Sequence, residues 1–280
     1  MARSGKLTRG GGGVRSLERG LALLVAVNRR KLASVAELAR DTALPRPTVY
    51  RLLETLGEAG FVSRDRATDR YQPSHGVRAL SDGFLDDEWV MEIATPLMAE
   101  FTRDHVWPVS LFTFDAGRML VRDTTHRLST LSIDYGMVGK RMPMLKTAGG
   151  MVYLAFCPDN ERRAILDLLA HSDAPEDQQA RESARLGQTF KTIRARGFAT
   201  QERTINPKAA SISVPILADR SVYGAMSLIW IASAMTMSEA EKTLLPPLKA
   251  MAAHLSQALQ ARRINPAAPP AAKAKALETA

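Results

Sequence analysis

Apolar residues recur at helical spacing in the first part of the chain. Residues 17–27 place their apolar side chains on one face of a helix. A second, short helix is expected after Ser34, because Ser34 and Glu37 have the spacing of a capping box. A third is expected over about residues 47–59, since its leading proline suits a first helical turn and Gly60 suits a helix end.

Two short runs with strand character follow at residues 61–64 and 70–72, around a polar turn at residues 65–69. We interpret them as a β-hairpin. Helix, helix, short turn, helix and hairpin is the element order of a winged helix-turn-helix. The pattern therefore predicts such a domain over residues 14–74, preceded by a flexible, Gly-rich basic arm at residues 1–13.

The rest of the chain alternates strands and helices. Residues 75–84 have a helical pattern, residues 86–88 should break it, and residues 89–105 have a longer amphipathic pattern. The linker helix is expected within residues 75–95. The expected strands lie at residues 107–114, 119–125, 211–217 and 222–232, and the expected helices at residues 148–156, 160–170, 184–196 and 238–263. This order predicts an α/β domain over residues 96–263 with one mostly antiparallel sheet.

The end of the chain has its own signals. The last helix is expected to begin at Ser238, because Ser238 and Glu241 again have capping-box spacing, and Pro246 and Pro247 should bend or restart it. The Ala/Pro/Lys-rich residues 264–280 predict a disordered tail. The fold class expected for the whole chain is α+β, in two domains.

Composition narrows the classes of function. The 280 residues are 45% apolar but contain no run long enough to span a membrane. The basic start leads into no apolar signal segment, and Cys157 is the single cysteine, which together favour a cytoplasmic protein without disulfides. Cys157 stands at an expected helix end, where the macrodipole raises a thiol pKa, so we expect a buried apolar role. Because no metal, nucleophile or phosphate-loop motif is present, we expect no metal, no cofactor and no enzyme activity.

Positive charge is concentrated near the N-terminus. The net charge is +9, and residues 1–75 hold 14 Lys and Arg against 7 Asp and Glu. Such an excess is typical of a protein that binds a polyanion, although a merely solubilising surface has the same composition. In a helix-turn-helix the third helix enters the major groove, where Arg pairs with guanine and a Thr methyl meets thymine, while Tyr reaches phosphate. The candidate contacts with double-stranded DNA are Arg46, Thr48, Tyr50 and Arg51 on the third helix, and Arg64, Arg66 and Arg70 on the wing.

Several motifs resemble one family. The stretches VRSLERGL at residues 14–21 and LPRPTVYRLL at residues 44–53 are similar to the N-terminal domain of IclR-type transcriptional regulators. In the second half, the similar segments are VGKRMP (138–143), TAGG (147–150), GFA (197–199) and VPI (214–216). The resemblance covers about residues 14–263 and implies a GAF-like domain that binds a small aromatic or aliphatic carboxylic acid. It also implies a homodimer or a dimer of dimers, for which the amphipathic residues 89–105 are the expected contact or relay element.

The resemblance also implies an effector cavity. The positions that match it are Leu131, Asp134, Ala148, Gly149, Gln201, Ala209, Ser211, Ser227 and Ile229. Independently, residues 147–150 place small residues at the positive end of an apolar helix, which suits a carboxylate but equally suits close helix packing. Further candidates for the phenol or carboxylate of an aromatic acid are His126, Arg127 and Arg141, of which the arginines are more typical of surface ion pairs. An adaptable pocket or plain core explains Met119, Met137, Met142 and Met144 equally well.

A narrower similarity concerns one subgroup. Residues 124–129, 145–148 and 233–236 resemble regulators that activate 3-(3-hydroxyphenyl)propionate catabolic genes, which implies an activator that works with RNA polymerase. Relatives usually have Ser or Thr where this chain has Pro47, so the resemblance does not specify which bases the third helix contacts. They often have an acidic side chain and a cysteine where this chain has Gln201 and Ser211, so the identity of the ligand can differ from theirs. The alternatives are a repressor that responds to another small carboxylic acid, and a small-molecule sensor whose first domain serves protein assembly.

Overall fold

The computed structural model describes residues 14–82, 87–218 and 221–264. The expected basic arm at residues 1–13 and the expected tail beyond residue 264 lie outside the described residues. The chain divides into two compact units, Met1–Phe84 and Leu85–Ala280. Each unit has a hydrophobic core of its own.

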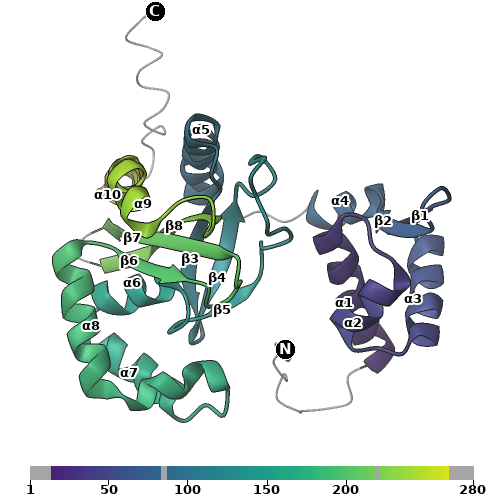
Figure 1. The fold of residues 1–280 in the computed structure, drawn as a ribbon, viewed down its shortest axis with the longest axis horizontal. Helices are drawn as coiled ribbons and strands as arrows, with labels where there is room; N and C mark the ends of the chain where they lie inside the picture. The colour runs from purple at the N-terminus through teal and green to yellow at the C-terminus, as the bar shows by residue number, and fades with distance from the viewer. Residues whose placement is uncertain (1–13, 83–86, 219–220, 265–280) are drawn as a thin grey trace, which may run out of the picture. The chain divides into compact units, whose positions relative to one another are not determined.

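The first unit has the predicted order of elements over the described residues 14–82 (Figure 1). They are α1 (Arg15–Arg30), α2 (Val35–Thr42), α3 (Arg46–Glu58), β1 (Val62–Asp65), β2 (Arg70–Pro73) and α4 (His75–Asp82). The centre of the core is built from Leu23, Val27, Leu38, Val49 and Leu53, none of them more than 1% exposed. The antiparallel β1–β2 hairpin forms the wing, so the predicted winged helix-turn-helix is confirmed.

The helix ends in this unit follow the local sequence. Ser34 and Glu37 form the expected capping box of α2: the Ser34 hydroxyl accepts from the Glu37 amide, and the Glu37 carboxylate accepts from the Ser34 amide at 2.8 Å. α3 begins after Pro45 without a side-chain cap, and Pro47 occupies its first turn. Gly60 follows α3 with a φ of 79°, a conformation that glycine adopts without strain, as expected for this helix end.

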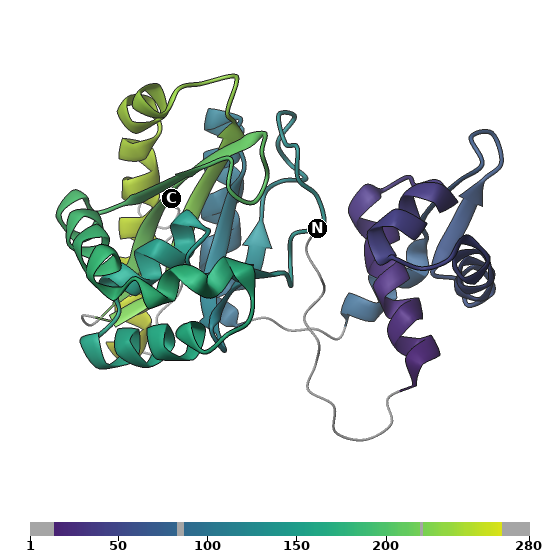
Figure 2. The same cartoon turned by 60° about the horizontal axis from the view of Figure 1, so that its bottom comes forward.

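The second unit is an antiparallel sheet between two groups of helices (Figures 1 and 2). Its described strands have the order β5-β4-β3-β8-β7-β6. Their bounds are β3 (Val109–Asp115), β4 (Arg118–Thr124), β5 (Arg141–Pro143), β6 (Ala199–Glu202), β7 (Ala209–Ala218) and β8 (Ser221–Ile231). The helices are α5 (Thr95–His105), α6 (Ala148–Phe156), α7 (Asp159–Ala170), α8 (Ser183–Arg196), α9 (Met237–Thr243) and α10 (Leu245–Ile264). The predicted α/β domain with an antiparallel sheet is therefore confirmed.

The two faces of this sheet carry different side chains, because successive residues of a strand point to opposite faces. On one face, Met226, Leu228 and Trp230 of β8 pack in a core with α5, α9 and α10. On the other face α6 packs against β6, β7 and β8, and α8 packs against α6. This face contains smaller or polar residues of β8, among them Ala225 and Ser227. A face with small side chains leaves space beneath the helices that cover it.

Residues 75–95 do not form one linker helix, contrary to the prediction. α4 packs against the first core through Val77, whereas the π-helical turn η1 (Val90–Ala94) is buried in the second. The helix expected over residues 89–105 is confirmed: residues 88–105 are continuously helical, and η1 is a π-helical turn that runs directly into α5. The break expected at residues 86–88 agrees with the non-helical Asp87 that precedes this helix.

The remaining differences lie at short elements and one cap. The strands β5 and β6 and the 3-10 helix η2 (Pro175–Arg181) were not predicted. α9 is capped by Thr236, whose side chain accepts from the Glu239 amide at 3.3 Å, so the predicted capping box at Ser238 is wrong. The expected restart at the two prolines is confirmed, because α10 begins at Leu245. No helix among the described residues is both long and apolar enough to cross a membrane.

Candidate DNA-contacting face and ligand cavity

The outer face of α3 carries the side chains predicted to contact bases. Arg46, Tyr50 and Arg51 are exposed, Tyr50 to 50%, and Thr48 is half-buried. No ion pair among the described residues engages Arg46 or Arg51. The N-terminal half of this helix therefore presents two uncompensated guanidinium groups and a phenol, a combination that suits base edges and phosphate.

The wing arginines are not equivalent. Arg64 forms an ion pair with Asp69 and lies over the Tyr71 ring, 5.9 Å from its centroid. The hydrogen bond to Asp69 raises the pKa of Arg64. At the turn, Asp65 accepts hydrogen bonds from the Ala67 amide and the Thr68 hydroxyl, each at 2.8 Å, and Arg66 is exposed. Arg66 is thus the wing cation best placed for a phosphate.

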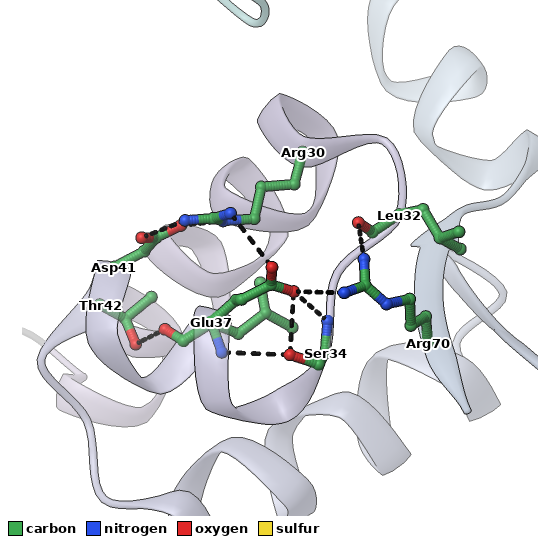
Figure 3. Close-up of polar contacts among 8 residues, drawn as sticks. Arg30, Leu32, Ser34, Glu37, Asp41, Thr42 and Arg70 are labelled. Atoms are coloured by element: carbon green, nitrogen blue, oxygen red, sulfur yellow. Dashed lines mark hydrogen bonds and ion pairs between the residues drawn. The ribbon is translucent and has the colours of Figure 1, made fainter. Parts of the chain in front are cut away.

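Arg70 is instead part of a polar network that ties the wing to α2 (Figure 3). Its guanidinium lies 3.5 Å from the Glu37 carboxylate and donates to the Leu32 carbonyl at 3.4 Å. The hydrogen bond from the Ser34 amide, with the bond from its hydroxyl, lowers the pKa of Glu37, so the carboxylate is ionised at neutral pH. Sequence reasoning placed Arg70 with the DNA contacts, but the structure gives it an intramolecular partner.

The ion pair between Arg30 and Asp41 extends this network beyond Glu37. Arg30 lies 3.6 Å from Glu37 and makes a bidentate contact with Asp41, at 2.5 and 2.9 Å (Figure 3). The hydrogen bond to Asp41 raises the pKa of Arg30. The network therefore fixes α1, α2 and the wing to one another at the surface of the first unit.

A cavity of about 320 Å³ lies in the second unit, above the strand face that carries small and polar residues. Seven of the predicted effector positions line it: His126, Asp134, Gln201, Ala209, Ser211, Ser227 and Ile229. The other lining residues are Ser110, Phe112, Met137, Lys140, Met142, Lys146, Thr147, Thr204, Ile205, Asn206, Pro207 and Ala210. The volume and the mixture of apolar and polar walls are those of a small-ligand site.

The inner wall of the cavity is rich in buried hydroxyl groups. The register places Ser110 of β3 opposite Ser227 of β8, and Ser227 opposite Ser213 of β7. The Ser213 and Ser227 hydroxyls are hydrogen-bonded to each other, and Ser110 bonds to Thr124 at 2.8 Å. Because Ser110, Ser213 and Ser227 are at most 3% exposed, these pairs satisfy polar atoms that burial would otherwise penalise.

His126 belongs to the same inner wall. Its side chain is buried and its Nδ1 lies 2.6 Å from the Ser132 hydroxyl. Burial lowers the pKa of His126 to about 4, although the nearby Asp134 opposes the shift. The imidazole is therefore neutral at physiological pH and is not a cation for a carboxylate.

The rim has a different character. Lys140, Lys146 and Asn206 are half-buried, and Ile205 is 46% exposed. Asn206 donates to the Asp134 carboxylate at 3.1 Å, and the Thr204 hydroxyl donates to the Lys146 carbonyl at 2.8 Å. These bonds join the segment after β6 to the segments before β5 and α6. The cations of the cavity thus stand nearer to solvent than its neutral polar groups.

Three predicted effector positions do not line the cavity. Leu131 is 40% exposed, and Ala148 and Gly149 are buried in the first turn of α6. Gly149 lets α6 approach the sheet closely, because a Cβ there would lie 3.3 Å from the Ser227 hydroxyl. The small residues at this helix start therefore serve packing, while Thr147 caps the helix by accepting from the Gly150 amide at 3.1 Å.

Of the remaining candidates for the cavity, some line it and others lie on the surface or in the core. Arg127 is exposed, and Arg141 forms an ion pair with Asp115 at 2.6 Å, so both arginines lie on the surface. Met137 and Met142 line the cavity, whereas Met119 and Met144 are fully buried core residues. Cys157 is buried, and burial raises its pKa to about 11, as expected for a residue with an apolar role.

Exposed arginines on a helix-turn-helix, together with a second unit that encloses a polar cavity, define a ligand-responsive DNA-binding regulator. Two family models match the chain. They are the IclR helix-turn-helix domain over residues 16–66 and the bacterial transcriptional regulator IclR C-terminal domain over residues 83–257. The chain belongs to the IclR family, whose members are transcriptional regulators and not enzymes.

Similar proteins agree with this assignment. The chain is 28% identical to the Pca regulon regulatory protein of Pseudomonas putida, across 87% of this chain and 84% of that protein. The crystal structure of IclR from Thermotoga maritima has a TM-score of 0.60 at 21% identity and covers 89% of this chain and 100% of that one. An IclR homologue from Microbacterium hydrocarbonoxydans, crystallised with 4-hydroxybenzoate, has a TM-score of 0.55 at 18% identity, across 88% of this chain and 99% of that one. The likeness confirms the fold, and the first family match decides against a first unit that serves only protein assembly.

Proposed function

We propose that this regulator binds its operator through α3 and the tip of the wing, and that its cavity binds a hydroxylated aromatic carboxylic acid of the hydroxyphenylpropionate class. Binding of the acid would activate genes for aromatic-acid catabolism. The observation that carries the proposal is the cavity itself, which combines aromatic and methionine walls with cations at the rim and neutral hydroxyls inside. An aromatic acid has matching apolar, anionic and hydroxyl parts.

The carboxylate is assigned to the rim. Lys146 supplies a positive charge, and Thr147 begins α6, whose N-terminal end carries a partial positive charge. A half-buried lysine keeps more of its hydration than a fully buried one, so pairing with an anion there has a smaller desolvation cost. The 4-hydroxybenzoate complex of the Microbacterium homologue supports an acid of this chemical class.

Operator binding is assigned to Arg46, Thr48, Tyr50 and Arg51, with Arg66 in contact with phosphate.

The proposed regulator is a homodimer, because two recognition helices are needed to read a palindromic operator. The apolar face of residues 89–105 is buried in the core of its own unit, with Met91 left 41% exposed. The dimer contact is therefore assigned to α1, where Leu17, Leu21 and Val25 form one stripe that is 60%, 53% and 48% exposed. A dimer of dimers would require a second contact in the other unit.

Calorimetry on the purified full chain tests the ligand. We expect micromolar binding of 3-(3-hydroxyphenyl)propionate, and a Lys146→Met variant should bind about tenfold more weakly because the carboxylate loses its cation. Arg141→Met, which removes a surface cation outside the cavity, is the matched control and should bind normally. Absence of heat with every phenylpropanoid acid would remove the ligand assignment.

Two further measurements test regulation and assembly. Transcription by purified RNA polymerase from the operator should rise when the acid is added, and a fall would favour the alternative of a repressor.

Sedimentation of the purified chain should give a dimer that Leu21→Glu converts to a monomer. Leu168→Glu, on an exposed leucine of α7, should leave the mass unchanged.

A further inference from the structure

The direction of the hydrogen bonds around His126 determines which atom it offers to the cavity. Ser132 has one hydroxyl proton, and its oxygen lies 2.9 Å from the Asp134 carbonyl oxygen and 2.6 Å from His126 Nδ1. A carbonyl can only accept, so the Ser132 proton goes to Asp134. The Ser132 oxygen then accepts from His126, which must carry its proton on Nδ1. With this direction the Asp134 carbonyl, the Ser132 hydroxyl and His126 Nδ1 all have a partner.

The other ring nitrogen is left as an acceptor. A neutral imidazole with a proton on Nδ1 has an unprotonated Nε2 with a lone pair. His126 lines the cavity while only 2% exposed, and no hydrogen bond among the described residues engages Nε2. A buried acceptor without a donor is costly, so this atom calls for a donor from within the cavity.

Ser110 offers a second acceptor to the same cavity. The Thr124 hydroxyl donates to the Val109 carbonyl at 3.2 Å, so the bond between Ser110 and Thr124 is donated by Ser110. Ser110 also lines the cavity, and its oxygen can then only accept from a ligand. The inner wall near β3 thus presents two neutral acceptors, and the two charges that act on His126, those of Asp134 and Lys140, are opposite in sign. A hydroxyl group, which can donate, suits this wall better than a carboxylate, which can only accept.

We infer that His126 is the specificity-determining residue of the cavity, and that its Nε2 accepts a hydrogen bond from a hydroxyl group of the effector. This inference rests on the proposed binding of an aromatic acid and names the feature by which that acid is selected. The ligand lies with its hydroxyl group at the inner wall and its carboxylate at Lys146. An acid with hydrogen or a methyl ether in place of the hydroxyl group leaves the acceptor unpaired.

Calorimetry with three acids tests the selection. In the wild-type chain, 3-(3-hydroxyphenyl)propionate should bind about tenfold more tightly than 3-phenylpropionate, and 3-(3-methoxyphenyl)propionate should be no better than the latter. Equal affinities for the three acids would overturn the role of His126 but leave the proposed ligand class intact. Binding of none of them would overturn both proposals.

Two variants locate the selection at the imidazole. His126→Phe keeps a ring but removes the acceptor, so the preference for the hydroxyl group should fall to near unity. Ser132→Ala leaves His126 in place but removes the acceptor that holds its proton on Nδ1, so the preference should fall by a smaller factor. Ser129→Ala is the matched control, because Ser129 is a buried serine of the same segment that bonds to the Leu131 amide. A preference that survives in His126→Phe overturns the inference.

Nitrogen NMR of the ligand-free chain gives a readout that does not depend on any acid. The His126 ring should show the proton on Nδ1 and a bare Nε2, and the Nε2 signal should shift when the hydroxylated acid is added. The opposite tautomer in the free chain would overturn the inference. Ser132→Ala should change the tautomer ratio even without ligand, while Ser129→Ala should not.

Discussion

In the first unit, charged side chains stay in contact with water, whereas the second unit withdraws several charged and polar groups from it. Arg30 and Asp41 pair at the surface, with about a third of each side chain exposed, 34% and 32%. Arg118 and Asp177 form an equally close bidentate pair in the second unit, but Asp177 is fully buried. The same chemistry thus occurs in two different dielectric environments.

The difference reflects what each unit has to bind. A duplex is a polyanion met at the surface, so the first unit needs cations that remain hydrated and mobile. A small ligand is enclosed, so polar groups of the second unit must be paired in advance or left for the ligand to pair. Removing a charge should therefore cost little folding stability where its pair is exposed, as for Arg30 and Asp41, and much more where its pair is buried, as for Arg118 and Asp177.

The largest effect is expected for Asp177→Ala. Its carboxylate accepts from the Arg118 guanidinium at 2.6 and 2.8 Å, and this contact joins η2 to β4. Removing it leaves a largely buried cation, and among the described residues the remaining carboxylate that pairs with it is that of Glu176, at 3.9 Å. We expect the free energy of unfolding of the second unit to fall by about 3 kcal/mol, measured by urea denaturation. The control is Glu182→Ala, which removes an exposed acid paired with Arg185 and should change stability by less than about 0.5 kcal/mol. Equal losses would contradict the contrast between buried and exposed pairs.

Arg51→Ala should have the next largest effect, on DNA affinity and not on folding. An arginine that pairs with a guanine edge contributes about 1–3 kcal/mol of discrimination. We expect the variant to lose about that much affinity for the specific operator and little affinity for random duplex DNA, measured by fluorescence anisotropy. Similar losses on both duplexes would mean that Arg51 contacts only phosphate.

The wing offers a smaller effect with an internal control. Arg66→Ala should weaken binding to operator and random DNA alike, by about 1 kcal/mol, and reduce the salt slope by about one ion. Arg70→Ala should leave the salt slope nearly unchanged, because its guanidinium is engaged by Glu37 and the Leu32 carbonyl. A larger loss of slope for Arg70 than for Arg66 would show that the network opens on DNA.

Local signals predicted most of the first unit. The capping box at Ser34, the proline in the first turn of α3 and the glycine after it each act within a few residues, so their effect can be read from the sequence. The partner of Arg70 could not be read in this way. Glu37 is distant in sequence and meets Arg70 only after the wing folds back on α2.

The cavity was predictable only in part. Its positions on β7 and β8 were found by resemblance. The alignment of Ser110, Ser227 and Ser213 across neighbouring strands depends on the pairing of β3 with β8 and of β8 with β7, which periodicity does not specify. β5 has only three residues and β6 four, too short for a clear alternation of apolar and polar positions. The rim residues Thr204 and Asn206 belong to an irregular segment after β6, and nothing in their local sequence indicates a cavity. Ala148 and Gly149 were assigned to the cavity by the resemblance, while the local sequence suited a ligand and close packing equally, and the structure shows the packing.

The smallest expected effect is that of Glu37 on the pH dependence of the first unit. Hydrogen bonds from Ser34, with Arg70 and Arg30 nearby, lower the pKa of Glu37 in the folded chain, so the ionised form stabilises folding. This contribution is complete above the unfolded pKa of about 4.3 and is lost as the pH falls through the lower, folded pKa. Glu37→Gln keeps a side chain that can complete the capping box but has no charge. We expect it to lower the unfolding free energy by about 0.5 kcal/mol at pH 7, because the side chain is 25% exposed and its ion pairs are screened. The loss should shrink towards the acid end of a melting series from pH 7 to pH 3, as the pH approaches the lowered pKa of the wild-type carboxyl group. A deficit that persists unchanged through this range would assign the stabilisation to capping geometry and not to charge.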